Sequence, residues 1–277
     1  MKNALKLFYV FIFHLGTMAY ATPNFKHVMI VVLENTDYSS AINQSFLAEL
    51  SKKGASLDNM TALTHPSQGN YIAMIAGDTF GIINDKNITL DAHHLGDLLE
   101  AKGLTWKVYA EDYPGNCFLG ATNGKYARKH VPFLSFKNVS TNSDRCRNIV
   151  SVNQLTIDLK MNSLPNYSIY IPNLNNDGHD TGASFADAYL SKTFGPLIHD
   201  PVFMSQMLFV VTFDESESKN NNNQIYTALF GDAVIAGAKS KKAYDHYSIL
   251  KMIELTWDLG SLSKKDLTSS AIDDVFR

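Results

Sequence analysis

Several features that mark other protein classes are missing from this 277-residue sequence. The formal net charge is −3, and the chain has no basic block or basic–aromatic stripe, which argues against nucleic-acid binding. After residue 21, no apolar run approaches the roughly 20 residues that a membrane-spanning helix needs. No G-x-S-x-G elbow occurs, which argues against the catalytic triad of an ordinary α/β hydrolase. No internal repeat or linker-like stretch divides the chain.

The first residues have the pattern of a secretory signal. Lys2 and Lys6 accompany an apolar stretch from Leu5 to Leu15, and Ala19-Tyr20-Ala21 provides a small-x-small cleavage pattern. A retained membrane anchor is the alternative, but the apolar stretch is too short to span a bilayer. We therefore expect residues 1–21 to be a signal peptide and 22–277 a single domain. The mature protein would be exported to the periplasm or secreted, without a transmembrane anchor.

Both cysteines, Cys117 and Cys146, lie in the expected mature chain. In an oxidising compartment their expected fate is a disulfide, and closing a loop of about 30 residues is worth on the order of 3 to 4 kcal/mol in the chain-entropy model. A catalytic thiol is the alternative, but Cys117 lies in a Pro-Gly-Asn turn without a recognisable motif. We predict the disulfide.

Apolar runs alternate with amphipathic segments along most of the chain, which is typical of helices covering a mostly parallel sheet. The pattern predicts an α/β fold of three layers. The expected strands cover 28–33, 105–110, 168–172, 207–213 and 225–230. The expected helices cover 38–52, the residues after Pro66-Ser67, a segment that stops at Gly103, 183–190 and 247–259. Residues 111–148 show little periodicity, and we interpret them as a long excursion over the site.

Two of the expected strands end in acidic or amide side chains. The run 28–33 leads into Glu34-Asn35, and the run 207–213 leads into Asp214-Glu215. Ligands of open α/β sheets bind beyond the carboxyl ends of the strands, and these four side chains would suit a hard divalent cation if the strands are neighbours. The alternative is that each pair caps a helix N-terminus.

A serine occurs where a helix is expected to begin, in the segment from Thr64 to Tyr71. Free N–H groups at a helix start suit a phosphoryl oxyanion, and a nearby cation would activate the Ser67 hydroxyl as a nucleophile. The alternative is that Ser67 only caps the helix.

Several histidines have neighbours that suit proton transfer or phosphate binding. His179-Asp180 follows an expected strand and could supply a metal ligand or a proton donor, although a polar turn is the alternative. His246 opens the last expected helix after Asp245. His130 lies in the excursion, within reach of a phosphate.

These segments together resemble one known family. The motifs that carry the resemblance are Glu34-Asn35, His65-Pro66-Ser67-x-x-Asn70-Tyr71, Asn173-x-x-x-Asp177-x-His179-Asp180, Asp214-Glu215 and His246-Tyr247-Ser248. In this order they resemble the bacterial phosphoesterase family of acid phosphatases and non-specific phospholipases C, within the alkaline-phosphatase-like superfamily. The resemblance spans about residues 26 to 258.

The resemblance implies an alkaline-phosphatase-like sandwich, a catalytic metal and a role for each matching position. The implied metal ligands are Glu34, Asn35, Asp214 and Glu215. Ser67 takes the place of the threonine nucleophile of a Thr-x-Pro-Asn-Arg motif. Gly69 and Tyr71 replace the proline and the arginine of that motif, so an arginine contact to phosphate is not implied. The remaining residues predicted to act in catalysis or substrate binding are His179, Asp180, His246, Asn70, His130 and His65.

The predicted function is that of an exported, metal-dependent phosphoric ester hydrolase acting on phosphomonoesters. Oxygen ligands favour Mg²⁺, Ca²⁺ or Mn²⁺, while a histidine ligand would admit Zn²⁺ or Fe. One alternative is a phospholipase C that contacts lipid surfaces transiently through Phe80, Phe118 and Phe133. The other alternative is an inactive binding module stabilised by a metal.

Overall fold

The computed structural model describes residues 23–219 and 222–277, so the expected signal peptide lies outside the described residues. The main sheet has the strand order β11-β2-β10-β9-β1-β8-β4-β7. Its strands are β1 His27–Leu33, β2 Ala55–Leu57, β4 Trp106–Ala110, β7 Ile149–Ser151, β8 Tyr167–Ile171, β9 Met207–Phe213, β10 Thr227–Phe230 and β11 Ala238–Ser240. Two small ribbons pair β3 Met60–Thr61 with β12 Tyr244–Asp245, and β5 Thr122–Asn123 with β6 Tyr126–Ala127.

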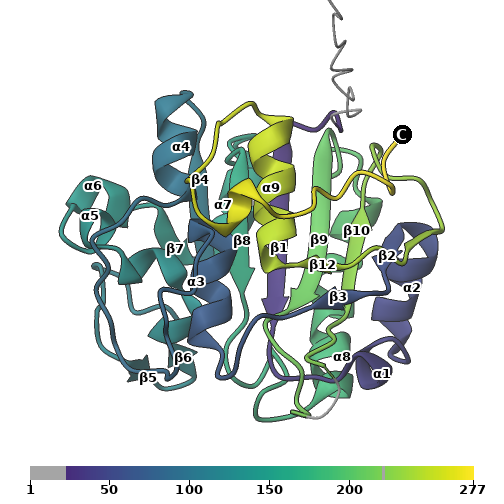
Figure 1. Cartoon of the computed structure of the whole chain (residues 1–277), viewed down its shortest axis with the longest axis horizontal. Coiled ribbons are helices and arrows are strands. Elements are labelled where there is room, and N and C mark those ends of the chain that lie inside the picture. Colours follow the sequence, from purple (N-terminus) through teal and green to yellow (C-terminus); the bar gives the residue numbers. More distant parts are fainter. Residues whose placement is uncertain (1–22, 220–221) are drawn as a thin grey trace, which may run out of the picture.

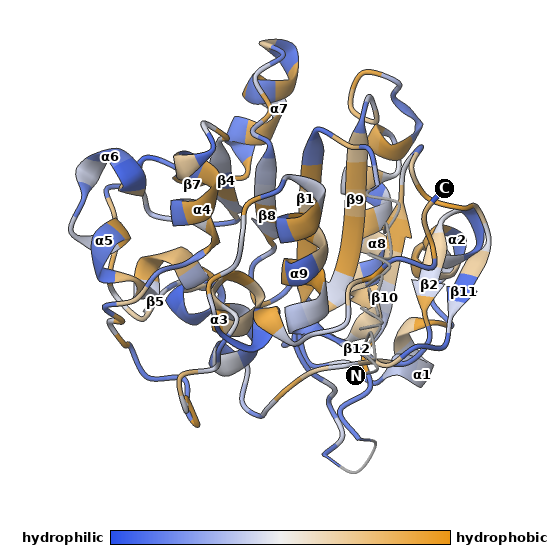
Figure 2. Ribbon diagram, turned by 45° about the horizontal axis from the view of Figure 1, so that its top comes forward, coloured by the Kyte–Doolittle hydropathy of each residue, from blue (hydrophilic) through white to orange (hydrophobic). Residues whose placement is uncertain are grey.

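Helices cover both faces of the sheet. They are α1 Tyr38–Ala41, α2 Ser45–Lys53, α3 Gln68–Ala76, α4 Leu95–Ala101, α5 Lys137–Ser140, α6 Ser143–Cys146, α7 Asn153–Lys160, α8 Ala183–Phe194 and α9 His246–Thr256. Short 3₁₀ turns cover Arg128–His130, Pro132–Ser135, Leu197–His199 and Lys265–Leu267. Helices α3, α4 and α9 lie on one face, and α2, α7 and α8 lie on the other (Figures 1 and 2). The predicted three-layer α/β fold is confirmed. Among the described residues, no helix is long and apolar enough to cross a membrane.

The two acid-ended strands are neighbours at the centre of the sheet. β1 lies between β8 and β9 and runs parallel to both, and Leu33 pairs with Phe213 in register. Both strands are buried almost throughout because helices cover both faces, which explains their continuous apolar sequences. Glu34 and Asp214 therefore leave the sheet at the same level, at the lower edge in Figure 1. β10 is antiparallel to both of its neighbours.

One expected helix differs from the structure. The segment 38–52 forms two helices, α1 and α2, instead of one. The side-chain amides of Asn43 and Gln44 donate hydrogen bonds to the carbonyl oxygens of Ser39 and Ser40, at 2.7 and 3.1 Å. Side chains of this kind compete with the backbone for helical hydrogen bonds, and the chain changes direction there.

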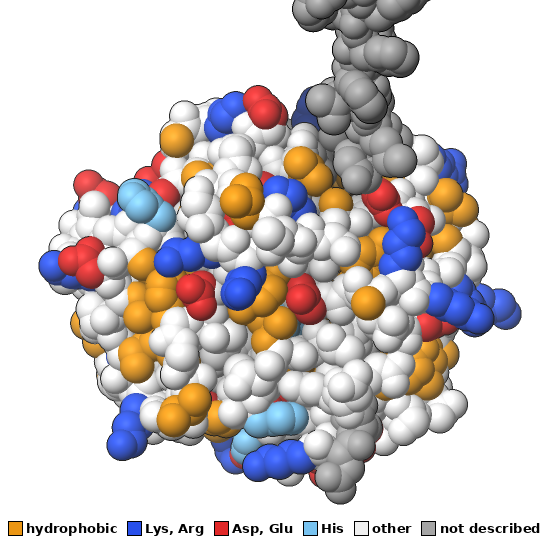
Figure 3. All heavy atoms as spheres, in the orientation of Figure 1, with side chains coloured by type: hydrophobic (Ala, Val, Ile, Leu, Met, Phe, Trp, Pro, Cys, Tyr) orange, Lys and Arg blue, Asp and Glu red, His pale blue; other side chains and the backbone are white. Residues whose placement is uncertain are grey.

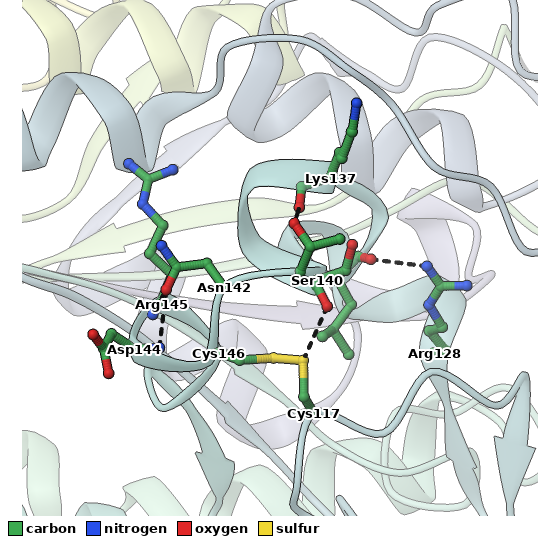
Figure 4. Close-up of a disulfide and its surroundings, with 10 residues drawn as sticks. Cys117, Arg128, Lys137, Ser140, Asn142, Asp144, Arg145 and Cys146 are labelled. Atoms are coloured by element: carbon green, nitrogen blue, oxygen red, sulfur yellow. Dashed lines mark hydrogen bonds between the residues drawn. A yellow bond between two sulfur atoms is a disulfide. The ribbon is translucent and has the colours of Figure 1, made fainter.

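The predicted disulfide is present and fastens the excursion between β4 and β7. Cys117 and Cys146 are bonded with their Cα atoms 5.5 Å apart (Figure 4). Within the closed loop, the Arg128 guanidinium is nearly buried and donates to the carbonyl oxygens of Ile88 and Leu134, at 3.0 and 2.8 Å. The disulfide and these bonds hold the turn Arg128–His130 against the end of the sheet.

Helix α9 carries a buried carboxyl group that predicts how stability depends on pH. Burial, and then the charge of Asp266, raises the pKa of Glu254 to about 8. Between the unfolded pKa near 4.5 and this value, the unfolded chain releases a proton that the folded chain keeps, so stability falls as pH rises. We expect Glu254→Gln to remove this loss. At pH 8 it should raise stability by on the order of 2 kcal/mol, or about 4 to 8 °C in Tm, and at pH 4.5 by little.

The measurement is thermal unfolding of both proteins across this pH range. Glu49→Gln is the control, because Glu49 forms an exposed pair with Lys53 at 2.6 Å, and such pairs contribute little. A Tm difference that is the same at pH 4.5 and pH 8 would contradict the proposed titration of Glu254.

Candidate active site

The acidic ends of β1 and β9 form the floor of the site. The side chains of Glu34, Asp214 and Glu215 are buried, and the Asn35 N–H donates to Asp214 Oδ1 at 3.1 Å. Asn35 has a left-handed backbone with φ of 32°, which an asparagine tolerates better than most residues. The two strand ends that the sequence placed at one edge thus touch each other.

Ser67 lies between the two acidic strand ends. It immediately precedes α3, and its side chain makes no capping hydrogen bond to that helix. Its Oγ is instead 3.0 Å from Glu34 Oε2 and 3.1 Å from Glu215 Oε1. A hydroxyl has one proton, so it donates to one of these carboxylates at a time. The site therefore holds the nucleophile candidate against two proton acceptors.

Lys129 places a cation beside this serine. Its Nζ is 3.4 Å from Ser67 Oγ and 2.9 Å from Asp85 Oδ2. Burial lowers the pKa of Lys129, but the carboxylates of Glu34 and Asp85 outweigh it and raise the pKa above its ordinary value. The ammonium group is therefore charged. Sequence reasoning missed Lys129, although it adjoins His130.

His130 lies behind Glu34. Its Nε2 is 3.1 Å from Glu34 Oε1, its Nδ1 is 3.7 Å from Asp177 Oδ2, and its ring stacks on Tyr71 with 4.9 Å between centroids. Burial lowers the pKa of His130 to about 4, so the ring is neutral near pH 7. This arrangement supports Glu34. A contact of His130 with phosphate stays a prediction.

The loop after β8 joins the floor through Asp177. The Asp177 backbone carbonyl accepts the Glu34 N–H at 3.0 Å, and its Oδ1 accepts the His179 N–H at 2.8 Å. Burial, and then Glu34, raises the pKa of Asp177 to about 9. His179 Nδ1 is 2.8 Å from Asp180 Oδ1, and Asp180 also pairs with Lys125 at 2.8 Å. Asp177 stands in the sequence motif, but its contact with Glu34 was not expected.

The other predicted residues lie around this centre. His65 Nδ1 contacts the Glu215 carboxylate directly. His246 is buried and its Nε2–H donates to the Asp214 carbonyl oxygen at 2.7 Å. The Asn70 amide bonds to the backbone of residues 63 and 64, with distances of 2.9 to 3.2 Å. Asn70 thus shapes the loop before Ser67, and its contact with substrate stays a prediction.

Several buried oxygen atoms at the floor form no well-aligned hydrogen bond, although His130 and His65 lie close to two of them. They are Glu34 Oε1, Asn35 Oδ1, Asp177 Oδ2, Asp214 Oδ2 and Glu215 Oε2. Burial and the neighbouring carboxylates, Glu34 foremost, raise the pKa of Asp214 well above its usual range and that of Glu215 to about 7. A bound cation would neutralise this concentrated negative charge and would give the unpaired oxygen atoms a partner. The described residues contain no ready-made cluster of three or more His, Cys, Asp or Glu ligands, so the fit depends on these oxygens together with the Asn35 amide.

Two hollows open above the floor. One has a volume of about 460 Å³ and is lined by Asn35, His65, Pro66, Glu215 and Lys219, among others. The second has about 570 Å³ and lies on the His179 side. Figure 3 shows histidine side chains and basic side chains (lysine or arginine) at this lower edge of the molecule. Substrate can therefore approach the strand ends from solvent.

The phospholipase alternative predicted an exposed apolar surface from three phenylalanines. Phe133 is fully buried, and Phe80 and Phe118 pack against the core. Phe80 and Phe118 are partly buried and none of the three is largely exposed, so they do not form an exposed apolar surface together.

Solved structures with similar folds belong to the alkaline phosphatase superfamily and related enzymes. A protein of the alkaline phosphatase superfamily from Vibrio parahaemolyticus has a TM-score of 0.60 at 13% identity. The match covers 91% of this chain and 72% of the Vibrio chain. A lipoteichoic acid synthase from Listeria monocytogenes has a TM-score of 0.63 at 9% identity, covering 93% and 78%. At these identities the likeness shows the fold, and it confirms the predicted alkaline-phosphatase-like architecture.

Curated relatives match nearly the whole chain. A probable acid phosphatase from Kluyveromyces lactis is 36% identical over 261 residues, covering 90% of this chain and 62% of the relative. A phosphatidylinositol-3-phosphatase from Mycobacterium tuberculosis is 35% identical over 249 residues, covering 88% and 81%. The chain spans about three fifths of the length of the fungal acid phosphatases that it matches. The model of the Phosphoesterase family matches residues 40–260. This chain therefore belongs to the phosphoesterase family.

Proposed function

We propose that this protein is a metal-dependent phosphomonoesterase in which Ser67 is the nucleophile. The observation that carries the proposal is the position of Ser67 Oγ, about 3 Å from Glu34 and Glu215 and 3.4 Å from the Lys129 ammonium. A nucleophile, two proton acceptors and a cation for the phosphoryl oxygens thus meet at one point. The relatives named as phosphatases support this reaction class.

The unpaired oxygens support a divalent cation at the floor. Glu34, Asn35, Asp214 and Glu215 would hold it, as the family resemblance implies. When bound, such a cation supplies charge neutralisation for phosphate and lowers the pKa of a hydroxyl. All-oxygen ligands favour Mg²⁺, Ca²⁺ or Mn²⁺ over Zn²⁺ or Fe.

The chain's own residues account for attack on phosphorus. Ser67 passes its proton to one of the two carboxylates that accept its hydrogen bond, and Oγ forms a bond to phosphorus. Lys129 holds the equatorial oxygens while charge shifts onto them. Asn70 keeps the loop before Ser67 in place. The product of this step is a phosphoserine.

The alcohol leaves in this same in-line step, and phosphate is released in a second step. As the bond from phosphorus to the ester oxygen breaks, His179 gives a proton to that oxygen, and Asp180 orients its ring. We favour His179 over His246 because His179 lines a hollow while His246 is buried against the Asp214 backbone. Water then attacks the phosphoserine, which restores Ser67 and frees inorganic phosphate.

We also propose that the protein is exported. The basic and apolar start of the sequence and the disulfide between Cys117 and Cys146 support this.

A paired assay tests the proposed reaction. Metal-stripped protein would receive Mg²⁺, Ca²⁺, Mn²⁺, Zn²⁺ or Fe²⁺ in turn, with p-nitrophenyl phosphate or phosphatidylcholine vesicles as substrate. We expect phosphate release from the monoester with at least one cation, and little release of phosphocholine. Faster cleavage of the lipid diester would favour the phospholipase alternative. Binding of a cation without any hydrolysis would favour the inactive module.

Lys129→Met should weaken both catalysis and phosphate binding. Losing one preorganised cation at the phosphoryl oxygens should lower kcat/KM for p-nitrophenyl phosphate by about 10²- to 10³-fold. The inhibition constant of inorganic phosphate should rise, and Lys129→Arg should recover part of the loss. Lys137→Met is the matched control, because Lys137 lies in the same excursion but pairs with exposed Asp91 at 3.0 Å. Equal activities of the Lys129→Met and Lys137→Met proteins would rule out this role.

A further inference from the structure

The second hollow, of about 570 Å³, is built from polar side chains on two segments that meet beside the strand ends. One segment covers residues 35–44, and the other covers 178–184 at the start of α8. The side chains that combine donors and acceptors of hydrogen bonds there are Asn35, Thr36, Ser40, Gln44, Thr181 and Ser184. This concentration of uncharged polar groups calls for a ligand that can bond to them.

The position of this hollow suits the alcohol part of a phosphate ester. Ser67's neighbours His65, Pro66 and Glu215 line the first hollow, while His179 lines the second, and both hollows include Asn35. In-line displacement places the leaving oxygen opposite the attacking one. An ester attacked from the Ser67 side would therefore direct its alcohol into the second hollow, past His179.

The lining selects among alcohols. Its residues include no phenylalanine, tyrosine or tryptophan to stack on a nucleobase or aryl ring, and no lysine or arginine to bind a second phosphate. Two carboxylates, Asp180 and Glu217, are present and would repel a further anion. We infer that the second hollow binds the alcohol part of the substrate, and that this alcohol is neutral and rich in hydroxyl groups, as a hexose is. The inference rests on the proposed phosphomonoesterase function.

A matched pair of substrates tests the inference. Glucose 6-phosphate and cyclohexylmethyl phosphate share a six-membered ring bearing CH₂–O–phosphate, and they differ in the hydroxyl groups and the ring oxygen. We expect kcat/KM to be at least about tenfold higher for the sugar, because unpaired polar groups in a site penalise an analogue that lacks its hydroxyls. Glucose 1,6-bisphosphate should be a poorer substrate than glucose 6-phosphate.

The two substrates also differ in their intrinsic reactivity. Comparing the ratio of their kcat/KM values between two variants cancels this difference. Gln44→Leu should lower the sugar-to-cyclohexyl ratio about fivefold or more, since it deletes an amide of the hollow. Asn43→Leu is the control, because Asn43 and Gln44 each donate one bond to a carbonyl four residues earlier but Asn43 does not line the hollow. The ratio should stay at the wild-type value in the control.

The outcomes separate this inference from the function on which it rests. Hydrolysis of neither monoester with any cation would contradict the phosphomonoesterase. Hydrolysis of both at similar kcat/KM, or a ratio that Gln44→Leu and Asn43→Leu change equally, would overturn the subsite alone. Faster hydrolysis of the bisphosphate would show that the α8 end of the hollow binds an anion instead of a neutral alcohol.

Discussion

Ser67→Ala is expected to reduce turnover of p-nitrophenyl phosphate by at least about 10³-fold, because covalent catalysis loses its nucleophile. The fold should persist, since the serine's neighbours Glu34 and Glu215 lose one small hydroxyl that bridges them. Acid quenching during turnover of ³²P-labelled substrate should trap phosphoprotein in the wild type and none in the variant. Cation binding, measured by elemental analysis, should remain.

Ser168→Ala provides the matched control for this experiment. Ser168 is also buried, and its hydroxyl donates to the Val28 carbonyl oxygen at 3.2 Å, near the opposite ends of the strands. Its loss should cost about 1 kcal/mol of stability without affecting phosphoprotein formation. If Ser67→Ala protein turned over within tenfold of the wild type, Ser67 would not be the nucleophile.

Asp214→Asn is expected to abolish the response to cations while leaving the metal-free protein as stable as the wild type or more so. Burial and repulsion from Glu34 and Glu215 raise the pKa of Asp214, so near neutral pH folding of the metal-free protein requires this carboxyl to take up a proton, a cost that the uncharged amide avoids. A bound cation stabilises the ionised Asp214 carboxylate, so adding the cation should raise the stability of the wild type and leave that of Asp214→Asn unchanged. At a cation concentration 100 times Kd, the wild type should gain about 2.7 kcal/mol, or roughly 5 to 10 °C in Tm.

Thermal unfolding with and without cation distinguishes this behaviour from a general loss of stability. Asp187→Asn is the control, because Asp187 is also largely buried but accepts the N–H groups of Phe46 and Leu47, at 3.1 and 2.9 Å. It should lower Tm and keep the full cation response. If Asp214→Asn kept that response too, the four proposed ligands would not form the cation site.

The sequence indicated where the candidate site lies because the apolar runs that form buried strands are local signals. Two buried strands of a parallel sheet read as continuous apolar runs, and the polar residues that end them must reach the same edge once the strands pair. Ser67 could be singled out for a similar reason, since a helix start is visible in the pattern that follows it. The pairing of Cys117 with Cys146 followed from their number.

Tertiary structure decided which polar residues face Ser67 and which support the ones that do. Lys129 and Asp85 come from aperiodic segments, and their positions depend on a disulfide, on the bonds of Arg128 and on packing far along the chain. Histidine is a common catalytic residue type, so the sequence could not show that the rings of His130 and His246 are buried. The ring of His130 lies against Glu34, and the ring of His246 lies against the Asp214 backbone.

The sequence by itself thus determined the fold class, the acidic ends of two strands and the serine beside a helix. Each of these depends on periodicity over a few residues. The structure alone decided that the Lys129 ammonium lies next to that serine, that two histidines have supporting positions, and that a polar hollow lies beside Asn35. These features arise from contacts between segments far apart in the chain, and no local pattern in the sequence indicates such contacts.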